Sequence, residues 1–456
     1  MHFFSIFINF LNAKVIKKLS LNLFYFFAKS LVKISFWFFY AKTTILNRKR
    51  GDFEGPVIVV SNHPATMMDP LNVVARIPRI AHFLANASMF KTKFGNWFFN
   101  TFFCIPVERY KDTGGKPLNN EQAFDKAIAH LSKGNVLFVC PEGSSFSERH
   151  LRPIKTGCGR IAMATAKAND FKINLRILPV GLTYADGTTF RDKVVINFGK
   201  MIQVADFQQY SFEDTFEDVR KLTEEIGQRL SELMVNARDK AEDIFIKKLE
   251  AIQQTELPLG EEKHFFRVKN LLQNFHQAQE KNGIYWSVFC EKVNTYFQQL
   301  TEIGSSDYGF KHAQNSWKDW LILIVGFPVF LFGYLNHYLP TFIPDRVYQY
   351  FKPDVSFAPT YKSLTGVITF PLFYFLQSVG VHLLFGNGWI TLIYILLLIP
   401  SGLIAERYLI FWNKVKERKN AAQFKQSNPD LFLQFQEMRA DILEKLSVLS
   451  SPNFSI

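Results

Sequence analysis

Two long stretches near the end of the sequence contain no charged side chain. Residues 320–344 and residues 363–405 lack Asp, Glu, Lys and Arg altogether. A helix needs about 20 predominantly apolar residues to cross a bilayer, and charge-free runs of this length are rare outside membranes. We therefore expect membrane segments over residues 316–412. A cytoplasmic tail helix is expected over residues 413–456, which follow.

The charges that flank these runs predict their orientation. The second run is long enough for two helices that turn at Gly386-Asn387-Gly388. The positive-inside rule assigns to the cytoplasm the basic flank that follows, with Arg407, Lys414, Lys416, Arg418 and Lys419. A hairpin returns the chain to the side it left, so residues 341–362 are expected in the cytoplasm too. Residues 320–344 are then expected to form a bent helix that enters and leaves the cytoplasmic leaflet, or one that packs on the rest of the protein. The alternative is that this helix forms a third span.

The first 50 residues carry Lys and Arg but no Asp or Glu. Lys interrupts the apolar residues too often for a spanning helix, so residues 1–50 predict one or two amphipathic helices in an anionic membrane interface. A core helix with basic edges is the alternative, because buried and interfacial stripes share one pattern. The formal net charge of +13 and the 49 Phe also fit a membrane surface. The sequence has no Arg/Gly-rich tract and no zinc-finger spacing, so nucleic acid is not expected as a partner.

Residues 55–200 alternate short apolar runs with helical stretches, which indicates an α/β layer fold. The runs that predict strands read PVIVV, FCIPVE, VLFVC, RILPVGLTY and KVVINFG. At 456 residues the chain is too long for one compact core. We expect an α/β domain over residues 51–210 and a helical region over residues 211–315, opened by a Ser211-x-x-Asp214 cap. The four cysteines form no C-x-x-C pair and are expected to be buried thiols in a reducing compartment.

The stretch VVSNHPATMMDPL, residues 59–71, brings a His and an Asp to the end of an expected strand. A carboxylate bonded to one ring nitrogen of His63 fixes the tautomer and stabilises the imidazolium, so that the other nitrogen can take a proton from a hydroxyl. Asp69 is the candidate carboxylate. A capping or packing role is the alternative for the pair taken alone. No G-x-S-x-G motif accompanies it, so a seryl enzyme is not indicated.

Two further segments end expected strands with polar residues. CPEGSSFSER, residues 140–149, puts a carboxylate and small residues after a buried strand. Gly143 permits close backbone approach there, and exposed amides can hold an oxyanion or a phosphate. FFCIPVERY ends a strand at Arg109, and Arg suits bidentate contact with phosphate. An ordinary strand-end turn is the alternative for each segment taken singly.

Together and in this order, the blocks NHPATMMD, IPVERY, PEGSS and LPVGLTY resemble those of the glycerophospholipid acyltransferase family, which includes lysophosphatidate acyltransferase. The resemblance covers residues 55–200. It implies an acyltransferase-type α/β layer domain, here with amphipathic N-terminal helices and with membrane helices after a helical region. It also implies that His63 is the catalytic base and that Asp69 orients it. The residues that it implies in binding the acceptor are Arg109, Glu142 and Gly143, and Pro179 is implied as structural. Ser144, Arg149 and Lys155 are further candidates for binding the substrate.

Two positions depart from the family's pattern. Five residues separate the His from the Asp where the family has four, and a subset that includes fungal glycerol-3-phosphate enzymes shares the longer spacing. Ser145 stands where the family often has Arg. Arg149, Arg152 and Lys155 follow closely and are expected to supply that charge.

The resemblance implies an enzyme that moves an acyl chain from acyl-CoA or acyl carrier protein to 1-acylglycerol-3-phosphate in phospholipid biosynthesis. Glycerol 3-phosphate or another lysophospholipid is the alternative acceptor. A membrane scaffold with an inactive acyltransferase fold is the alternative of another class. A lipid hydrolase is disfavoured, because thioester transfer requires that water be kept out. Membrane phospholipids and acyl-CoA or an acidic acyl carrier protein are the expected partners, no metal or cofactor is expected, and the site is expected to face the cytoplasm from an integral membrane protein.

Overall fold

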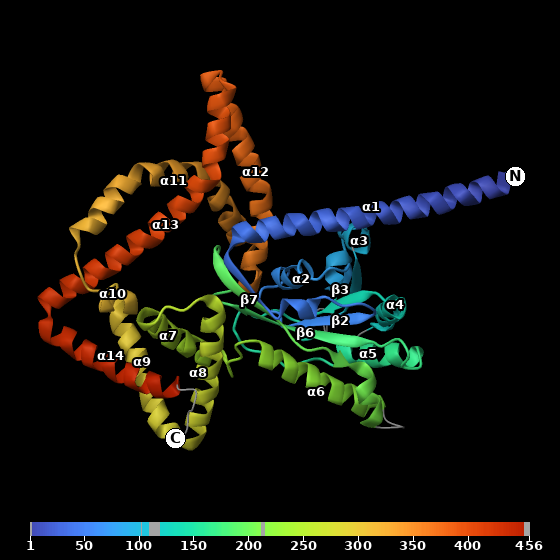
Figure 1. Ribbon diagram of the computed structural model, residues 1–456, viewed down its shortest axis with the longest axis horizontal. Helices are drawn as coiled ribbons and strands as arrows, with labels where there is room; N and C mark the ends of the chain where they lie inside the picture. Colours follow the sequence, from blue (N-terminus) through green and yellow to red (C-terminus); the bar gives the residue numbers. More distant parts are fainter. Residues whose placement is uncertain (1, 102, 109–118, 211–214, 451–456) are drawn as a thin grey trace. The chain divides into compact units, whose positions relative to one another are not determined.

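The computed structural model describes residues 2–101, 103–108, 119–210 and 215–450 (Figure 1). The chain divides into two compact units, which consist of residues 1–236 with 354–360 and of residues 237–353 with 361–456. The expected Ser211-x-x-Asp214 cap lies outside the described residues.

The first unit is built on an eight-stranded sheet. The strands are β1 (Tyr40–Leu46), β2 (Val57–Ser61), β3 (Ala81–Asn86), β4 (Cys104–Val107), β5 (Val136–Val139), β6 (Arg176–Tyr184), β7 (Asp192–Phe198) and β8 (Ile202–Gln203). Their order is β1-β7-β6-β2-β5-β3-β4, and β8 also pairs with β6. The pairs that β6 makes with β7 and β8 are antiparallel, and the other pairs are parallel. The sheet is therefore mixed, with a parallel centre around β2.

Helices cover both faces of this sheet (Figure 1). They are α1 (His2–Phe39), α2 (Met68–Val74), α3 (Lys93–Thr101), α4 (Glu121–Ser132), α5 (Gly157–Ala168) and α6 (Thr215–Leu233). Val57 and Val59 of β2 join the core that contains side chains of α1 and α2. Ile58 and Val60 join the core formed with α4, α5 and α6. Burial on both faces explains why β2 is a continuous apolar run and does not alternate with polar residues.

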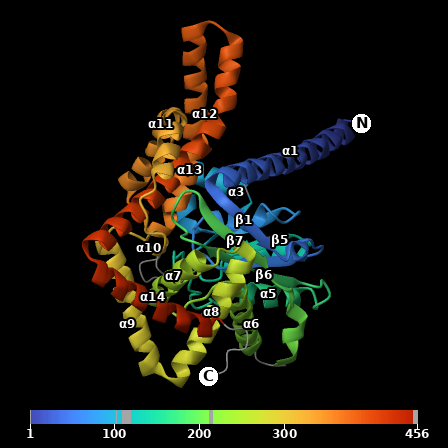
Figure 2. The ribbon, with the colours of Figure 1, turned by 60° about the vertical axis from the view of Figure 1, so that its left-hand side comes forward.

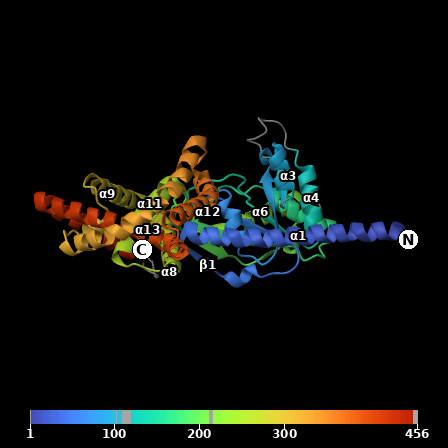
Figure 3. The ribbon, with the colours of Figure 1, turned by 90° about the horizontal axis from the view of Figure 1, so that it is seen from above.

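The α/β layer fold is confirmed, and the five expected strands correspond to β2, β4, β5, β6 and β7. The structure adds β1, β3 and the two-residue β8, which the sequence analysis did not predict. It forms one helix, α1, where one or two were expected, and the chain then enters β1 before residue 50 (Figure 3). Because β1 pairs with β7 and α6 packs into the core, the first unit extends beyond the expected bounds of 51–210 on both sides.

Helix α1 has apolar side chains on more than one side. Tyr25, Phe36 and Phe39 are buried against the first unit. The large apolar side chains that stay exposed are Leu23, Phe24, Phe26, Phe27, Leu31, Ile34 and Trp37. An exposed apolar surface of this kind on a basic helix supports the proposed position of α1 in a membrane interface.

The second unit is helical. Its helices are α7 (Lys240–Glu256), α8 (Glu261–Lys281), α9 (Gly283–Glu302), α10 (Asp307–Lys311), α11 (Trp317–Phe351), α12 (Ala358–Phe385), α13 (Gly388–Ser427) and α14 (Pro429–Leu449), of which α12 begins inside the segment 354–360 of the first unit. A buried ion pair joins α14 to α10, because Arg439 donates from Nε and Nη2 to the two carboxylate oxygens of Asp307 at 2.8 and 3.0 Å. Tyr296 of α9 donates to the same carboxylate at 2.8 Å.

Three helices among the described residues are long and apolar enough to cross a membrane, namely α11, Val355–Phe385 and α13. In their most apolar windows only 11%, 6% and 17% of the residues are buried in the protein, so these surfaces require an apolar environment. Figure 2 shows α12 and α13 side by side as a hairpin. Its turn is the expected one: Gly386 has a φ of 61°, and Asn387 caps α13 by accepting from the Trp389 amide at 2.9 Å.

Helix α11 is continuous over 35 residues, although it contains Pro328, Pro340 and Pro344. Its length and composition suffice for a span, which agrees with the three-span alternative. The orientation of the spans stays a prediction. Helix α13 also passes the expected boundary at residues 412–413 without a break.

Candidate active site

The topology brings two of the sequence blocks to one edge of the sheet. β2 and β5 are parallel neighbours, and Val60 pairs with Val139. His63 stands three residues after Val60 and Glu142 three residues after Val139, so both lie at the carboxyl ends of these strands. The backbone amide of His63 donates to Glu142 Oε1 at 2.7 Å, and the Phe146 amide donates to the His63 carbonyl at 3.2 Å. The loop after β2 and the loop after β5 are thus bonded to each other.

His63 and Asp69 form the predicted pair. The Nδ1 atom of His63 lies 2.9 Å from Oδ2 of Asp69. The side chain of His63 is 21% exposed and that of Asp69 is fully buried, so the imidazole can meet a substrate while the carboxylate supports it from behind. The structure therefore holds the contact that orients a histidine base, with Nδ1 as the supported nitrogen.

A network of buried groups holds Asp69. Its Oδ2 also accepts from the Ala65 amide at 2.8 Å, and its Oδ1 accepts from the Tyr184 hydroxyl at 2.8 Å. Asn72 donates to the hydroxyls of Tyr184 and Tyr40 at 3.1 and 3.0 Å. The sequence analysis missed these supporting residues. Tyr184 is the last residue of the fourth block, LPVGLTY, and of β6, which pairs with β2. Its position at the carboxyl end of a strand beside β2 could have identified it as a neighbour of the dyad.

Asn62, directly before the histidine, is a second residue that the sequence analysis missed. It is buried, and its side chain bonds to the backbone of β6 in both directions. Nδ2 donates to the Leu182 carbonyl at 2.9 Å, and Oδ1 accepts from the Leu182 amide at 2.7 Å. Asn62 therefore continues the pairing of β2 with β6 past the end of the strand, which fixes the direction in which His63 leaves the sheet.

The pKa values of the pair follow from burial and mutual contact. Burial by itself would lower the pKa of His63, but the neighbouring Cys140 sulfur and the Asp69 carboxylate raise this pKa well above its ordinary value. Burial raises the pKa of Asp69, and the hydrogen bond and charge of His63 oppose the rise. The raised pKa makes the neutral imidazole of His63 a stronger proton acceptor and stabilises the imidazolium that forms when it takes a proton.

Glu142 was expected to bind substrate, but its visible contacts support the loops. It is buried, and its two carboxylate oxygens accept from backbone amides, one from His63 at 2.7 Å and one from Arg152 at 3.0 Å. Burial raises the pKa of Glu142, while these backbone bonds oppose the rise. Glu142 thus joins the loop of His63 to the basic segment after the third block.

Gly143 has a φ of 69°, a left-handed conformation that glycine adopts readily. A Cβ at this position would lie 2.8 Å from Nζ of Lys155, so the lysine side chain crosses directly over the glycine. The Gly143 amide donates to the Cys140 carbonyl at 3.1 Å and closes the turn. Its amide is therefore engaged within the turn, and the role of Gly143 is to let Lys155 approach.

The remaining predicted residues surround this turn. Ser144 is half-buried in it, Arg149 is buried, and Arg152 lies with its guanidinium carbon 4.5 Å from the centre of the Phe146 ring. Arg149, Arg152 and Lys155 provide positive charge on the segment that follows Glu142. Arg109 lies outside the described residues.

Pro179 occupies the position in β6 where partners change. β6 pairs with β8 at Arg176 and Ile177 and with β7 from Val180 onward. Proline has no amide hydrogen, so it fits the gap between these two ladders. Its carbonyl accepts from the Gly199 amide at 2.8 Å. These contacts agree with the structural role that the family resemblance implies.

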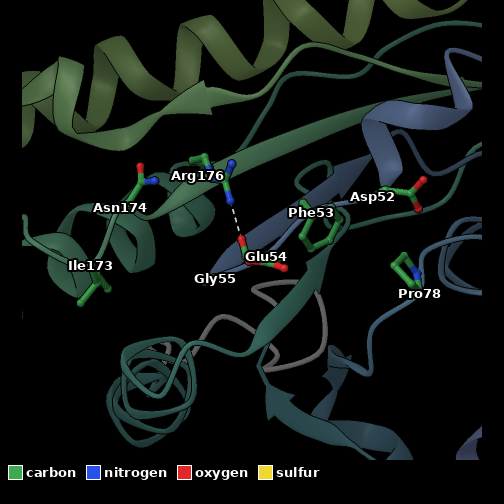
Figure 4. Close-up of a pocket in the computed structure, with 8 residues that line it drawn as sticks. All are labelled: Asp52, Phe53, Glu54, Gly55, Pro78, Ile173, Asn174 and Arg176. Carbon is green, nitrogen blue, oxygen red and sulfur yellow. Dashed lines mark hydrogen bonds between the residues drawn. The ribbon is translucent and has the colours of Figure 1, made fainter.

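An open pocket of about 820 Å³ lies away from these groups (Figure 4). Its lining includes Glu54 and Gly55, just before β2, and Arg176, the first residue of β6. The Arg176 guanidinium donates to the Glu54 carbonyl. This pocket is therefore at the amino ends of the parallel strands, whereas His63 is at their carboxyl ends.

Comparisons with known proteins find similarity over part of this chain. Residues 40–183 match the family model described as Acyltransferase. The Saccharomyces cerevisiae protein Glycerol-3-phosphate O-acyltransferase 1 is 27% identical over 119 residues, which are 25% of this chain and 16% of that protein. Glycerol-3-phosphate O-acyltransferase 2 of the same yeast is 30% identical over 123 residues, 27% of this chain and 16% of that protein. The 1-acyl-sn-glycerophosphate (LPA) acyltransferase PlsC from Thermotoga maritima is a solved structure with 18% identity and a TM-score of 0.33, covering 46% of this chain and 80% of that one.

The matched segment begins with β1 and ends within β6, so it contains the sheet edge that carries His63, Asp69 and Glu142. This part of the chain is an acyltransferase domain. Its sequence blocks and its matched relatives resemble those of the glycerophospholipid acyltransferase family. The chain spans only 16% of the length of each of the two yeast relatives.

Proposed function

We propose that this protein transfers an acyl chain from an acyl thioester to a hydroxyl of a glycerol-phosphate acceptor. The observation that carries the proposal is the His63–Asp69 contact of 2.9 Å at the sheet edge, with the imidazole partly exposed and the carboxylate buried. A dyad of this form removes a proton from a hydroxyl without an enzyme nucleophile. The whole reaction rests on this chain's own residues and on its two substrates, and the proposed chemistry requires no metal or cofactor.

The proposed reaction has one attacking group and one leaving group. His63 takes the proton of the acceptor hydroxyl while the hydroxyl oxygen attacks the thioester carbonyl. Asp69 stabilises the imidazolium that forms. The tetrahedral intermediate then collapses, the carbon–sulfur bond breaks, and the thiol leaves with a proton. The products are an ester and the free thiol of coenzyme A or of an acyl carrier protein.

The positive segment after the third block is the proposed site of the acceptor's phosphate. Lys155 lies over Gly143, and Glu142 joins the same segment to the loop of His63 through the Arg152 amide. Arg109, at the end of the second block, is proposed to contribute to the same phosphate site. A basic site of this kind suits a phosphate-bearing acceptor and also the acidic donors acyl-CoA and acyl carrier protein.

Two acceptors are consistent with the site. The family resemblance gives 1-acylglycerol-3-phosphate as the first candidate. Glycerol 3-phosphate is the second, favoured by the names of the two yeast relatives and by the five-residue spacing between the His and the Asp. Both acceptors place a hydroxyl within a few bonds of a phosphate, so one site chemistry serves either.

The three apolar helices and the exposed apolar surface of α1 support a membrane location for this reaction. We further propose that the acyltransferase domain faces the cytoplasm, since acyl thioesters are made there and the chain's Lys- and Arg-rich flanks follow the positive-inside rule.

The test is a transfer assay on the purified full chain in lipid vesicles. The acceptors are 1-acylglycerol-3-phosphate, glycerol 3-phosphate and other lysophospholipids, each with acyl-CoA and with acyl carrier protein as donors. Transfer to at least one phosphate-bearing acceptor is expected from the wild type, and His63→Ala is expected to lose about 100-fold to 10,000-fold. His276→Ala is a matched control, because His276 forms a partly buried pair with Glu242 at 2.9 Å outside the site. A wild type without transferase activity would favour the inactive scaffold, and a His63→Ala variant with near-normal turnover would overturn the mechanism.

A further inference from the structure

A short segment of the chain lies in the first unit although both of its neighbours belong to the second. Residues 354–360 group with the acyltransferase unit, while residues 237–353 and 361–456 form the other unit. The segment joins α11 to α12, two of the three apolar helices. We call it the linker segment. Its position requires contacts with the acyltransferase unit that hold it there.

The linker segment has a defined local structure. Asp354 accepts hydrogen bonds from the amide and the hydroxyl of Ser356 at 2.9 and 2.8 Å, which starts a single turn of 3₁₀ helix over Val355–Phe357. The side chains of Ser356, Ala358 and Thr360 are buried, with exposed fractions of 1%, 3% and 8%. The linker segment is therefore ordered and packs within the acyltransferase unit, in addition to connecting α11 to α12.

Thr360 makes one specific contact with the loop of the dyad. Its Oγ1 lies 2.6 Å from Oγ1 of Thr66, and both residues are buried. Thr66 stands midway between His63 and Asp69 in the sequence. The hydroxyl pair is therefore attached to the loop that sets the distance between the base and its carboxylate.

Thr66 is also the residue of this loop that most needs support. Its φ is 47°, a left-handed conformation that β-branched residues rarely adopt. Its amide donates to Oγ of Ser145 at 3.0 Å, so the third block holds the backbone of Thr66 and Thr360 holds its side chain. A strained conformation persists only where its surroundings determine it, and Thr66 is held by these two contacts and by its carbonyl, which accepts from the Asp69 amide at 3.3 Å.

We infer that Thr360 is a positioning residue for the acyl-transfer reaction: it holds Thr66, and through it the loop that keeps His63 and Asp69 in contact. The linker segment between two apolar helices is thereby a structural part of the active site. The inference rests on the proposed function, because it assigns the dyad to catalysis. Thr360 itself acts on the loop and has no contact with the reacting atoms in this inference.

Two substitutions at this residue separate the hydroxyl from the packing. Thr360→Val removes the hydroxyl and keeps the shape, and Thr360→Ser keeps the hydroxyl and removes a methyl group. Misplacement of a catalytic group by about 1 Å costs up to about 100-fold, so we expect Thr360→Val to lower kcat by about 10-fold to 100-fold while both KM values change less than about twofold. Thr360→Ser should restore kcat. Because a looser dyad raises the pKa of His63 less, the acid limb of the pH profile should move to lower pH in Thr360→Val alone.

Thr369→Val is the matched control. Thr369 is a buried threonine of the same helix, and its hydroxyl donates to the Pro340 carbonyl at 3.1 Å within the second unit. This variant also loses one buried hydrogen bond, so it reproduces any general loss of stability. We expect Thr369→Val to keep the kcat and the pH profile of the wild type, measured per mole of folded protein in vesicles.

The double variant Thr66→Val/Thr360→Val tests the contact itself. Each single change breaks the same hydroxyl pair, so the double change should cost no more than about the larger single one. Multiplying effects would show that the two residues act separately and would overturn the inference. An unchanged kcat in Thr360→Val, or an equal loss in Thr369→Val, would also overturn it. If His63→Ala retains activity, the proposed function fails; if His63→Ala is inactive and Thr360→Val is normal, the inference about Thr360 alone fails.

Discussion

Substitution of Asp69 by Asn removes the charge of the dyad and keeps its shape, and the structure determines how the new amide sits. Oδ2 of Asp69 accepts from both the His63 ring and the Ala65 amide. An NH2 group in this position would face the Ala65 N–H, donor against donor, so the amide oxygen takes it instead. The NH2 group then faces the hydroxyl of Tyr184, which can accept a hydrogen bond. His63 therefore keeps its proton on Nδ1, and its other nitrogen stays available as a base.

The loss in Asp69→Asn is then the loss of a charge. Two opposite unit charges about 4 Å apart attract by about 4 kcal/mol at an effective dielectric constant near 20. Since about 1.4 kcal/mol corresponds to tenfold in rate, and part of the attraction already exists in the free protein, kcat should fall by about 100-fold to 1,000-fold. The pH profile shifts too. The base form is lost as the pH falls through the pKa of His63, which lies well above 6.5 in the wild type. Without the carboxylate this pKa falls, so the acid limb moves to lower pH.

The assay is a pH series of kcat/KM for acyl transfer on purified protein in vesicles. Asp192→Asn serves as the control, because Asp192 is a buried carboxylate of the same unit that accepts from the amides of Asp186 and Gly187. That variant should lower the melting temperature and leave kcat per folded protein unchanged. The reasoning is refuted if Asp69→Asn stays within about threefold of the wild type, or if its acid limb moves to higher pH.

Four further outcomes are expected. Tyr184→Phe removes a hydrogen bond to the buried carboxylate of the dyad, which should destabilise the fold by about 1.5–3 kcal/mol, and a melting temperature equal to that of the wild type would contradict this. Arg109→Ala should raise the acceptor's KM much more than the donor's, and steady-state kinetics with equal effects on both would remove this residue from the phosphate role. A cysteine introduced at Asn387 should react with an impermeant thiol reagent outside intact cells, because the hairpin turn is expected there, and a buried turn would leave it unlabelled. A cysteine at Pro353 should stay unlabelled if α11 does not cross the bilayer, and its labelling would establish a third span.

The central strands were predictable because their apolar runs are buried on both faces, as in β2 and β5. β1 escaped prediction because its sequence, YAKTTIL, continues the basic and aromatic character of the preceding helix. Its pairing with β7 depends on a contact between residues about 150 positions apart, which no local pattern contains. β3 escaped because AHFLAN has polar residues at His82 and Asn86, and only its first residue is fully buried.

The dyad was predictable from its spacing, whereas its supports were not. His63 lies in the loop after β2 and Asp69 in the first turn of the helix that follows, so a short motif contains both. Tyr184 reaches the carboxylate from β6, and only the strand order shows that β6 lies beside β2. The contacts of Glu142 were missed for a different reason: its partners are backbone amides, and amides leave no trace in a sequence motif.

Helix α13 consists of an apolar half, which is charge-free, and a charged half, on which other helices of the second unit pack. Its 40 residues extend about 60 Å at 1.5 Å per residue, but the hydrocarbon core of a bilayer is only about 30 Å thick. The charge-free part ends before Glu406, so the remaining half projects from the bilayer as a rigid rod. α10 and α14 pack on this half, and Arg418 forms an ion pair with Asp319 of α11 at 2.6 Å. A change in helix tilt of about 20° would move the far end of the rod by about 11 Å. Because helix tilt responds to bilayer thickness, a change in that thickness would displace the helices that pack on this half.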